Sequence, residues 1–282
     1  MEGTKHITYD HSGKTAVITG GTTGIGRAIA LALAEAGATV VIDHLNDPKG
    51  ADATVAQIKE AGGNAISVQA DVSKPDEVKH LFAEAAKQTG AIDILVNNAS
   101  VEVNKYVWEM SDDDYRWVMA NSLDSVFYCS KYVLPYMIPG KSGKIINISS
   151  IHDEVPRIMA SPYCASKAGL LMLTKVFALE LAPFNIQVNA VSPGVVRTER
   201  TGHVWEKIEL NKAAHAVIEA NPYKRAGVVS EIVEPVLYLC SPFSSYTNGT
   251  TLYVDGGYRL HVSPLIEGDP YPHLDALKEV NP

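Results

Sequence analysis

Tyr163 and Lys167 are the residues of this sequence best suited to proton transfer, and they lie in the segment Tyr163-Cys164-Ala165-Ser166-Lys167. Residues four apart share one face of a helix, so the phenol and the ammonium would lie close together. A free phenol has a pKa of about 10, and a nearby positive charge stabilises the phenolate. Tyr163 could then accept a proton from an alcohol or donate one to a carbonyl oxygen. Such a pair also occurs on ordinary helix surfaces, so it does not define a site alone.

Ser150 adds a third polar group, 13 residues before Tyr163 and just after the apolar run KIINI at Lys144–Ile148. That run has the composition of a buried strand, and open α/β sheets bind ligands beyond the carboxyl ends of such strands. The Ser150 hydroxyl would hydrogen-bond and orient the oxygen of a bound substrate. Ser149 is the neighbouring alternative for the same task.

A glycine-rich segment, TGGTTGIG at residues 19–26, lies between an apolar run and a helical pattern. A loop that binds a dinucleotide must turn sharply, let a pyrophosphate approach its backbone, and begin a helix whose N-terminus faces the anion. Side chains at Gly20, Gly24 or Gly26 would obstruct one of these requirements. Tight turns use glycine for other reasons too, but the position between a strand and a helix favours dinucleotide binding.

Apolar runs and helical patterns alternate along the rest of the chain, and the runs are apolar enough to be buried on both faces, as in parallel sheets. This alternation predicts an α/β fold, a Rossmann-type doubly wound parallel sheet of about seven strands. We expect strands at residues 15–19, 39–43, 65–69, 92–96, 144–148, 186–191 and 251–254, and helices at 26–36, 51–61 and 75–88.

No linker or internal repeat interrupts this pattern, so we expect a single nucleotide-binding domain over residues 1–282. Two additions flank its body: a polar N-terminal extension, 1–13, and a C-terminal tail, 258–282. Four prolines make most of the tail unsuited to helix. Tyr271 and His273 in the tail could reach a pocket of the same or a neighbouring subunit.

The composition narrows the class of protein. A net charge of −8 without a basic patch argues against nucleic acid and against an anionic membrane surface. The sequence contains no run of 18 apolar residues, so we expect no membrane-spanning helix. The polar N-terminal segment lacks the apolar core of a signal peptide, and we therefore expect a cytoplasmic protein. Three widely spaced cysteines, Cys129, Cys164 and Cys240, predict neither a disulfide framework nor a metal site. Cys164 is either a reactive thiol beside Tyr163 or a small core residue.

From about Gly13 to Gly257 the sequence resembles the short-chain dehydrogenase/reductase family. The resemblance is carried by TGGTTGIG at 19–26, Asp71-Val72, NNAS at 97–100 with Ser100 where the family has glycine, Pro193-Gly194, and Val254-Asp255-Gly256-Gly257. Asn121, Ser150, Tyr163 and Lys167 match the family's catalytic tetrad. The resemblance implies an NAD(P)-dependent oxidoreductase with a sheet of seven parallel strands, assembled as a homotetramer.

The resemblance also implies roles for individual residues. Lys167 would bind the nicotinamide ribose as well as act on Tyr163, and Asn121 would hold a water near Lys167 in a proton relay. From the residues alone, Asn121 is simply a polar residue within a helix. The cofactor is expected to lie against Gly20, Thr23, Gly24, Ile25, Gly26, Asp43, Asp71, Val72, Asn98, Ala99, Tyr163, Lys167, Pro193, Gly194 and Val196.

The end of the second strand bears on the choice between NAD and NADP. A carboxylate there bonds the ribose hydroxyls and repels a 2′-phosphate, whereas arginine does the reverse. Asp43 is close to that position, but the family's usual NAD aspartate aligns with His44. Leu45 stands where NADP-dependent members often carry arginine, and no basic residue occupies the glycine loop. The sequence therefore weakly favours NAD and leaves NADP open.

Two segments resemble the glucose 1-dehydrogenase-like group: NNASVE at 97–102 and SSIHD at 149–153. This implies oxidation of an aldose to its lactone, with Glu102 and His152 bonding sugar hydroxyls, and thus a sugar or polyol as substrate. Both residues could instead lie on the surface. The loop 198–226, with Arg200, His203 and Trp205, covers the substrate in the family.

Three alternatives stay open. The same residues could reduce a ketone, a 3-oxoacyl group or a steroid. The chain could be a nucleotide-sensing regulator with a silent site, although such proteins commonly lose the tyrosine or lysine that this sequence keeps. Isomerases and epimerases among the extended relatives are usually longer and carry a larger substrate domain.

Overall fold

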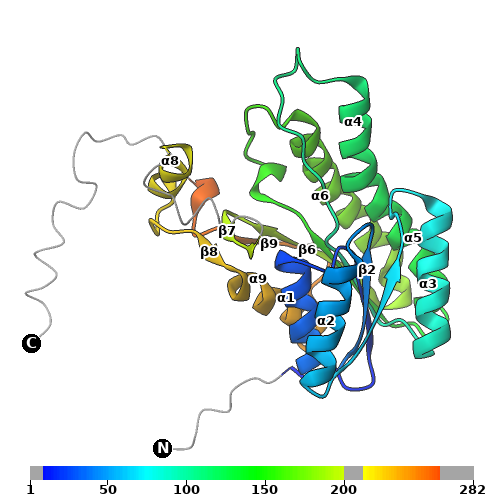
Figure 1. The fold of residues 1–282 in the computed structure, drawn as a ribbon. Helices are drawn as coiled ribbons and strands as arrows, with labels where there is room; N and C mark the ends of the chain where they lie inside the picture. The colour runs from blue at the N-terminus through cyan, green and yellow to red at the C-terminus, as the bar shows by residue number, and fades with distance from the viewer. Residues whose placement is uncertain (1–8, 200–211, 261–282) are drawn as a thin grey trace, which may run out of the picture.

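The protein is described by a computed structural model, which covers residues 9–199 and 212–260. The predicted features at Arg200, His203, Trp205, Tyr271 and His273 lie outside these residues. The chain alternates strands and helices around one central sheet (Figure 1), as the sequence pattern predicts.

Seven parallel strands form the sheet in the order β3-β2-β1-β4-β5-β6-β9. The order reverses between β1 and β4, which makes the switch point where open α/β sheets bind ligands. The fold is therefore the predicted Rossmann-type, doubly wound α/β sheet. The strands are β1 (Thr15–Ile18), β2 (Thr39–His44), β3 (Asn64–Gln69), β4 (Ile94–Asn97), β5 (Gly143–Ile148), β6 (Ile186–Pro193) and β9 (Thr251–Val254).

Helices cover both faces of the sheet and enclose two apolar cores. Alternate strand residues divide between them: Ile18 packs with α1, α2 and α9, whereas Val17 packs with α3, α5 and α6. This division follows from the two-residue period of a strand. The helices are α1 (Gly24–Glu35), α2 (Pro48–Glu60), α3 (Pro75–Thr89), α4 (Asp112–Met119), α5 (Ser125–Met137), α6 (Ser161–Leu181), α8 (Lys212–Ala220) and α9 (Val229–Cys240).

Shorter elements connect the layers near the carboxyl edge of the sheet. A π-helical turn, η1 (Ala120–Asp124), joins α4 to α5, and a 3-10 turn, η2 (Ile151–Asp153), follows β5. Two short strands, β7 (Val196–Arg197) and β8 (Gly227–Val228), pair with each other outside the main sheet.

Two helices begin earlier in the chain than the sequence pattern predicts. Helix α1 begins at Gly24 rather than at residue 26, and α2 begins at Pro48, where Asp47 caps it by accepting a hydrogen bond from the Gly50 amide at 3.0 Å. A proline is well tolerated at the first helical position. No helix in the two described ranges is long and apolar enough to cross a membrane.

Candidate active site

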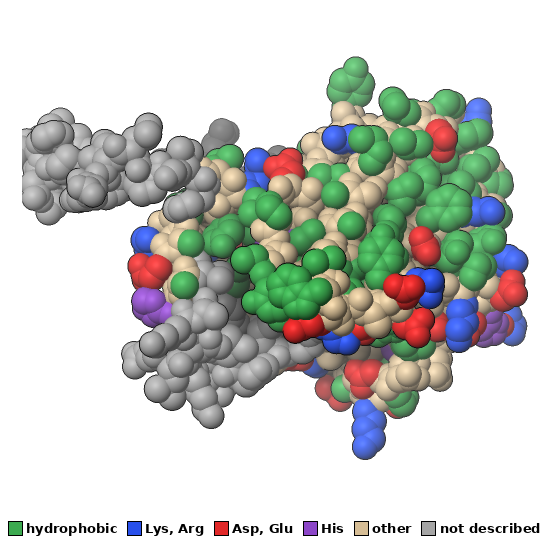
Figure 2. Space-filling view, turned by 90° about the horizontal axis from the view of Figure 1, so that it is seen from above, with side chains coloured by type: hydrophobic (Ala, Val, Ile, Leu, Met, Phe, Trp, Pro, Cys, Tyr) green, Lys and Arg blue, Asp and Glu red, His purple; other side chains and the backbone are tan. Residues whose placement is uncertain are grey.

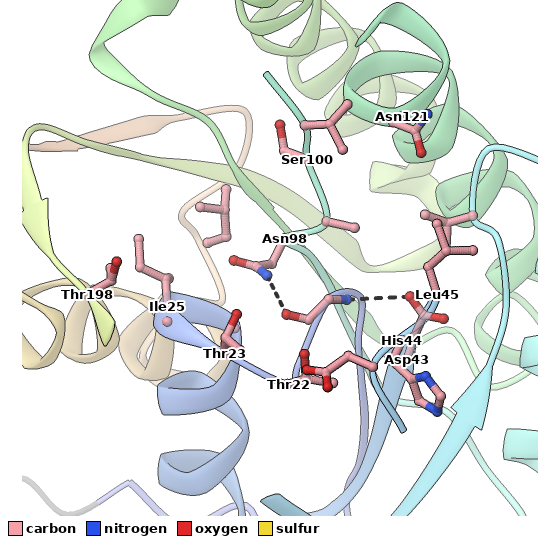
Figure 3. Close-up of a pocket in the computed structure, with 18 of the residues that line it drawn as sticks. Thr22, Thr23, Ile25, Asp43, His44, Leu45, Asn98, Ser100, Asn121 and Thr198 are labelled. Carbon is pink, nitrogen blue, oxygen red and sulfur yellow. Dashed lines mark hydrogen bonds between the residues drawn. The ribbon is translucent and has the colours of Figure 1, made fainter. Parts of the chain in front are cut away.

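A cavity of about 660 Å³ lies at the carboxyl edge of the sheet, across the switch point (Figure 3). Its lining joins the glycine loop after β1 to residues that follow β2 to β6. Every catalytic and cofactor residue expected from the sequence lines it: Gly20, Thr23, Gly24, Ile25, Gly26, Asp43, Asp71, Val72, Asn98, Ala99, Asn121, Ser150, Tyr163, Lys167, Pro193, Gly194 and Val196. The lining thus brings together residues from eight parts of the chain.

The glycine loop has the backbone geometry that a close phosphate contact requires. Gly20 and Gly24 have φ angles of 63° and 56°, which side-chain-bearing residues rarely adopt. A Cβ at Gly26 would lie 2.3 Å from the Gly20 oxygen and 2.4 Å from the Asn98 side-chain nitrogen. Glycine is therefore needed at Gly26 for the loop to close on Asn98.

Asn98 fixes this loop from the end of β4. Its Nδ2 donates to the Thr19 and Gly20 carbonyls, both at 3.0 Å, as Figure 3 shows for Gly20. Helix α1 then starts at the cavity with Thr23 extended and no side-chain cap on its first amides. Uncapped amides at a helix N-terminus bind anions well, so this end of the cavity fits a pyrophosphate.

Asp43 lies beneath the glycine loop rather than free in the cavity. Its side chain is 2% exposed, Oδ2 accepts a bond from the Gly20 amide at 3.4 Å, and Oδ1 is buried without a partner. Burial raises the pKa of the Asp43 carboxyl to about 8. The neighbouring His44 is also buried, whereas the Leu45 side chain is 44% exposed at the rim.

Tyr163 and Lys167 lie one turn apart on α6, as their spacing predicts. The Lys167 Nζ is 5.5 Å from the centre of the Tyr163 ring and donates to the Ile148 carbonyl at 3.0 Å. The Lys167 side chain is only 3% exposed, and burial lowers its pKa to about 8. The ammonium is therefore held on the tyrosine side of the cavity by the end of β5.

Burial raises the pKa of the Tyr163 phenol, and a hydrogen bond with Ser150 opposes this effect. The sequence suggested that Lys167 would lower the pKa of Tyr163, but in the protein alone burial outweighs every stabilising contact. Ser150 comes directly after β5 and caps η2, where its Oγ accepts a bond from the His152 amide at 3.2 Å. The phenol is thus protonated in the protein alone.

Asn121 lies in the π-helical turn η1, not in a regular helix. Its Nδ2 donates to the Trp117 carbonyl at 2.9 Å, and its main-chain oxygen accepts from the Ser125 Oγ at 2.9 Å. Turns of this kind often occur at functional sites because they redirect a residue within a helix. The distortion places Asn121 in the cavity lining.

Glu102 and His152 lie beside Tyr163 but outside the cavity lining. The Glu102 Oε1 pairs with the Arg157 Nη2 at 2.5 Å and accepts from the Asn104 Nδ2 at 2.6 Å. The His152 ring is 6.4 Å from the Tyr163 ring, and its Nδ1 bonds the Val155 carbonyl at 2.9 Å. Burial lowers the pKa of His152, so the neutral ring donates through Nδ1 and leaves Nε2 as an acceptor.

Two residues near the site were not singled out from the sequence. The Arg157 guanidinium carbon lies 5.7 Å from the centre of the Tyr163 ring. The same guanidinium forms an ion pair with Glu102. Asp153 is 8% exposed and bonded to groups from three strand ends. Both residues lie between Ser150 and Tyr163 in the sequence, and this position was the feature that could have identified them as part of the site. No group of metal-ligating side chains occurs in the described ranges.

The fold is thus a Rossmann-type sheet with a glycine loop at its switch point, and Ser150, Tyr163 and Lys167 line the same cavity as that loop. A family model described as enoyl-(acyl carrier protein) reductase matches residues 20–259. The chain is 36% identical over 258 residues to glucose 1-dehydrogenase 2 of Bacillus subtilis, covering 91% of this chain and 98% of that protein. It is 37% identical over 244 residues to a 3-oxoacyl-(acyl-carrier-protein) reductase of Staphylococcus epidermidis, covering 86% and 98%.

Solved structures agree with these relatives. A short-chain type dehydrogenase/reductase from Mycobacterium marinum superposes with a TM-score of 0.82 at 34% identity, covering 89% of this chain and 97% of that one. A structure from Agrobacterium tumefaciens that holds NADP gives a TM-score of 0.80 at 33% identity, covering 90% and 99%. The chain belongs to the short-chain dehydrogenase/reductase family of oxidoreductases.

Proposed function

We propose that the chain transfers hydride between a nicotinamide dinucleotide and a hydroxyl or carbonyl substrate, with Tyr163 moving the accompanying proton. The observation that carries this proposal is that Ser150, Tyr163 and Lys167 line the same cavity as the glycine loop. The positive φ angles of Gly20 and Gly24 shape a loop whose backbone a dinucleotide can approach, and the uncapped start of α1 fits its pyrophosphate.

A bound nicotinamide supplies the hydride acceptor for oxidation or the donor for reduction. The chain's own residues orient the substrate and manage the proton. Ser150 bonds the substrate oxygen, and Tyr163 accepts the hydroxyl proton in oxidation or returns it to the carbonyl oxygen in reduction. The Lys167 ammonium stabilises the phenolate and bonds the nicotinamide ribose, while Asn121 holds a water beside Lys167 to connect the proton to solvent.

For the substrate we propose an aldose, oxidised to its lactone. The His152 Nε2 accepts from one sugar hydroxyl, and Glu102 accepts from another while Arg157 and Asn104 hold its carboxylate in place. Polar groups held in place in this way favour substrates that satisfy them over apolar analogues. Similarity to glucose 1-dehydrogenase 2 supports the sugar. Reduction of a ketone or 3-oxoacyl group is the second candidate, because a 3-oxoacyl reductase is similarly related.

A substrate panel tests this proposal. Aldoses, polyols, apolar ketones and a 3-oxoacyl thioester are each offered with NAD and with NADP, in the direction that each requires, and nicotinamide absorbance is followed. We expect turnover of an aldose, with the Glu102→Gln variant showing a KM about ten-fold higher because one hydrogen bond to a charged group is weakened. Turnover of apolar ketones alone would support the second candidate. No turnover of any compound would support a silent nucleotide sensor.

We propose NAD as the preferred cofactor. In the described part of the chain, the cavity lining has Asp43, Asp47 and Asp71 near its β2–β3 end and no arginine. Asp71 is paired with Lys74 at 3.2 Å, and the raised pKa of Asp43 weakens its repulsion of a phosphate. The preference therefore rests on Asp47 and on the lack of a cation at Leu45. The related structure with bound NADP keeps the alternative open to experiment.

The Leu45→Arg variant should shift the preference toward NADP. Leu45 is exposed at the rim, and its carbonyl accepts a hydrogen bond from the Gln69 Nε2 at 2.9 Å. This bond holds the backbone in place, so an arginine side chain at this position would extend from the same point of the rim. A guanidinium pairs well with a phosphate, and we expect kcat/KM for NADP relative to NAD to rise about ten-fold or more. Leu45→Met is the matched uncharged control. A wild-type enzyme that strongly favours NADP would contradict the proposed preference.

We further propose that the chain assembles as a homotetramer in the cytoplasm. Met172, Val176 and Leu179 recur at helical spacing on α6, with the Leu179 side chain 78% exposed, and Phe127 adds to them from α5. Hydrophobic side chains gather on the side of the molecule where α4, α5 and α6 lie (Figure 2). A continuous exposed apolar face is typical of a subunit interface. A second copy of this chain would bury it.

A further inference from the structure

Asp153 is a buried carboxylate at the meeting point of three strand ends. Its Oδ2 accepts from the Ser149 Oγ at 2.9 Å and from the Ser192 Oγ at 2.5 Å. Its Oδ1 accepts from the Tyr253 hydroxyl at 3.2 Å. These donors come from beyond β5, from β6 and from β9, so one side chain joins three neighbouring strands at the carboxyl edge of the sheet.

All three partners of Asp153 are hydroxyl donors, and this arrangement suits an ionised carboxylate, which only accepts. Burial raises the pKa of Asp153, while the bonds from Ser192, Ser149 and Tyr253 oppose the rise. A carboxylate that accepts several bonds in a buried place is fixed in orientation. Removing its charge would leave the hydroxyls to find weaker acceptors.

The bonded hydroxyls belong to residues next to those that hold the reactants. Ser149 immediately precedes Ser150, and Ser192 immediately precedes the Pro193-Gly194 turn. Ser150 and Gly194 both line the cavity, on the proposed substrate and nicotinamide sides respectively. Asp153 therefore connects the two backbone segments whose separation sets the distance between hydride donor and acceptor.

Asp153 also acts on Lys167 through its charge. Burial lowers the pKa of the Lys167 ammonium to about 8, and the negative charge of Asp153 works against that lowering. The other titratable groups near this centre are Tyr163 on the same helix as Lys167, His152 from η2, Glu154 directly after η2 and Tyr253 on β9. Glu102 and Arg157 act on the Tyr163 phenol. The Asp153 carboxylate thus favours the charged form of Lys167.

We propose that Asp153 is a positioning residue for hydride transfer, which fixes the Ser150 segment against the Pro193-Gly194 turn and supports the positive charge of Lys167. This inference rests on the proposed oxidoreductase function. A purely structural role would also explain the buried bonds. It would predict a loss of thermal stability without a change in the pH dependence of turnover or in the hydride-transfer step.

The test compares Asp153→Asn with two matched variants, using the substrate and cofactor that the wild-type enzyme turns over. Asp52→Asn makes the same substitution at an exposed position on α2 and should behave as wild type. Ser192→Ala removes one donor but keeps the Asp153 charge. Each variant is measured for kcat across pH in the oxidative direction, for the primary deuterium isotope effect on kcat, and for its melting temperature.

We expect Asp153→Asn to lower kcat by about 10- to 100-fold, as for a small misplacement of reacting groups, and to increase the isotope effect as hydride transfer becomes limiting. The alkaline decline of activity should move down by about one pH unit because Lys167 loses a neighbouring negative charge. Ser192→Ala should lower kcat by less and leave the pH profile in place. If Asp153→Asn does not fold, Tyr253→Phe and Ser192→Ala should both still increase the isotope effect.

An unchanged kcat, isotope effect and pH profile in Asp153→Asn would overturn the inference, as would a loss explained by melting alone. If that variant does not fold, unchanged isotope effects in both substitutes would also overturn it. A wild-type enzyme that neither reduces nor oxidises a nicotinamide with any panel substrate would instead contradict the proposed function. The two failures are thus distinguishable.

Discussion

Tyr163→Phe should lower kcat by about 10²- to 10⁴-fold, the range typical of losing a positioned general acid or base. The variant loses one hydroxyl and keeps the ring that packs between Arg157 and Lys167. Cofactor affinity should change little, because the phosphate loop is untouched. Steady-state kinetics with the panel substrate, together with cofactor titration by fluorescence, measures both quantities.

Tyr246→Phe provides the matched control for the loss of a phenolic hydroxyl. Tyr246 is fully exposed and does not line the cavity. Loss of its hydroxyl should therefore leave kcat and cofactor affinity unchanged. Wild-type turnover in Tyr163→Phe would remove the assignment of the proton-transferring residue. Equal losses of kcat and cofactor binding would instead indicate a structural defect.

Lys167→Met should lower kcat by about 100-fold or more and weaken cofactor binding, because one ammonium is proposed both to stabilise the phenolate and to bond the ribose. Methionine has a similar length and replaces a side chain that is only 3% exposed, so the fold should persist. Lys175→Met, two turns along the same helix, is the control because Lys175 is exposed. A Lys167→Met variant with normal cofactor affinity would contradict the dual role.

The pH dependence of oxidation follows from the same residue. Burial lowers the pKa of Lys167 to about 8, so the ammonium is present below that value and is lost as the pH rises through it. The phenolate that acts as base depends on this ammonium for its stabilisation, so oxidation should decline as the pH rises through about 8. Lys167→Arg keeps its charge throughout and should lack the decline, which a pH profile of kcat/KM would show.

The sequence predicted the fold well because its strands are apolar on both faces and its glycines mark the turns. All seven expected strands occur, and the β1–α1 loop lies where the pattern TGGTTGIG placed it. The helices between residues 101 and 142 were not delimited. Pro135 lies inside α5, and α4 gives way to a π-helical turn, so simple helical periodicity is interrupted there.

The sequence predicted those parts of the candidate site in which residues lie at a fixed spacing on one element. It did not predict the positions of side chains that depend on contacts between distant parts of the chain. The spacing of four residues on one helix correctly predicted that Lys167 lies beside Tyr163. The pairing of Glu102 with Arg157 joins residues 55 positions apart, and the bond of Asp153 to Tyr253 spans 100 positions. Neither contact leaves a local pattern in the sequence. The burial of Asp43 under the glycine loop also depends on tertiary packing.

The most direct test of the central claim follows a deuterium atom. The wild-type enzyme is given a panel substrate deuterated at the reacting carbon, and the reduced nicotinamide is analysed by mass spectrometry. Direct hydride transfer predicts one deuterium in each reduced nicotinamide, at a rate that Tyr163→Phe lowers about 10²- to 10⁴-fold. Reduced nicotinamide without deuterium, or labelled product formed equally fast by Tyr163→Phe, would contradict the account.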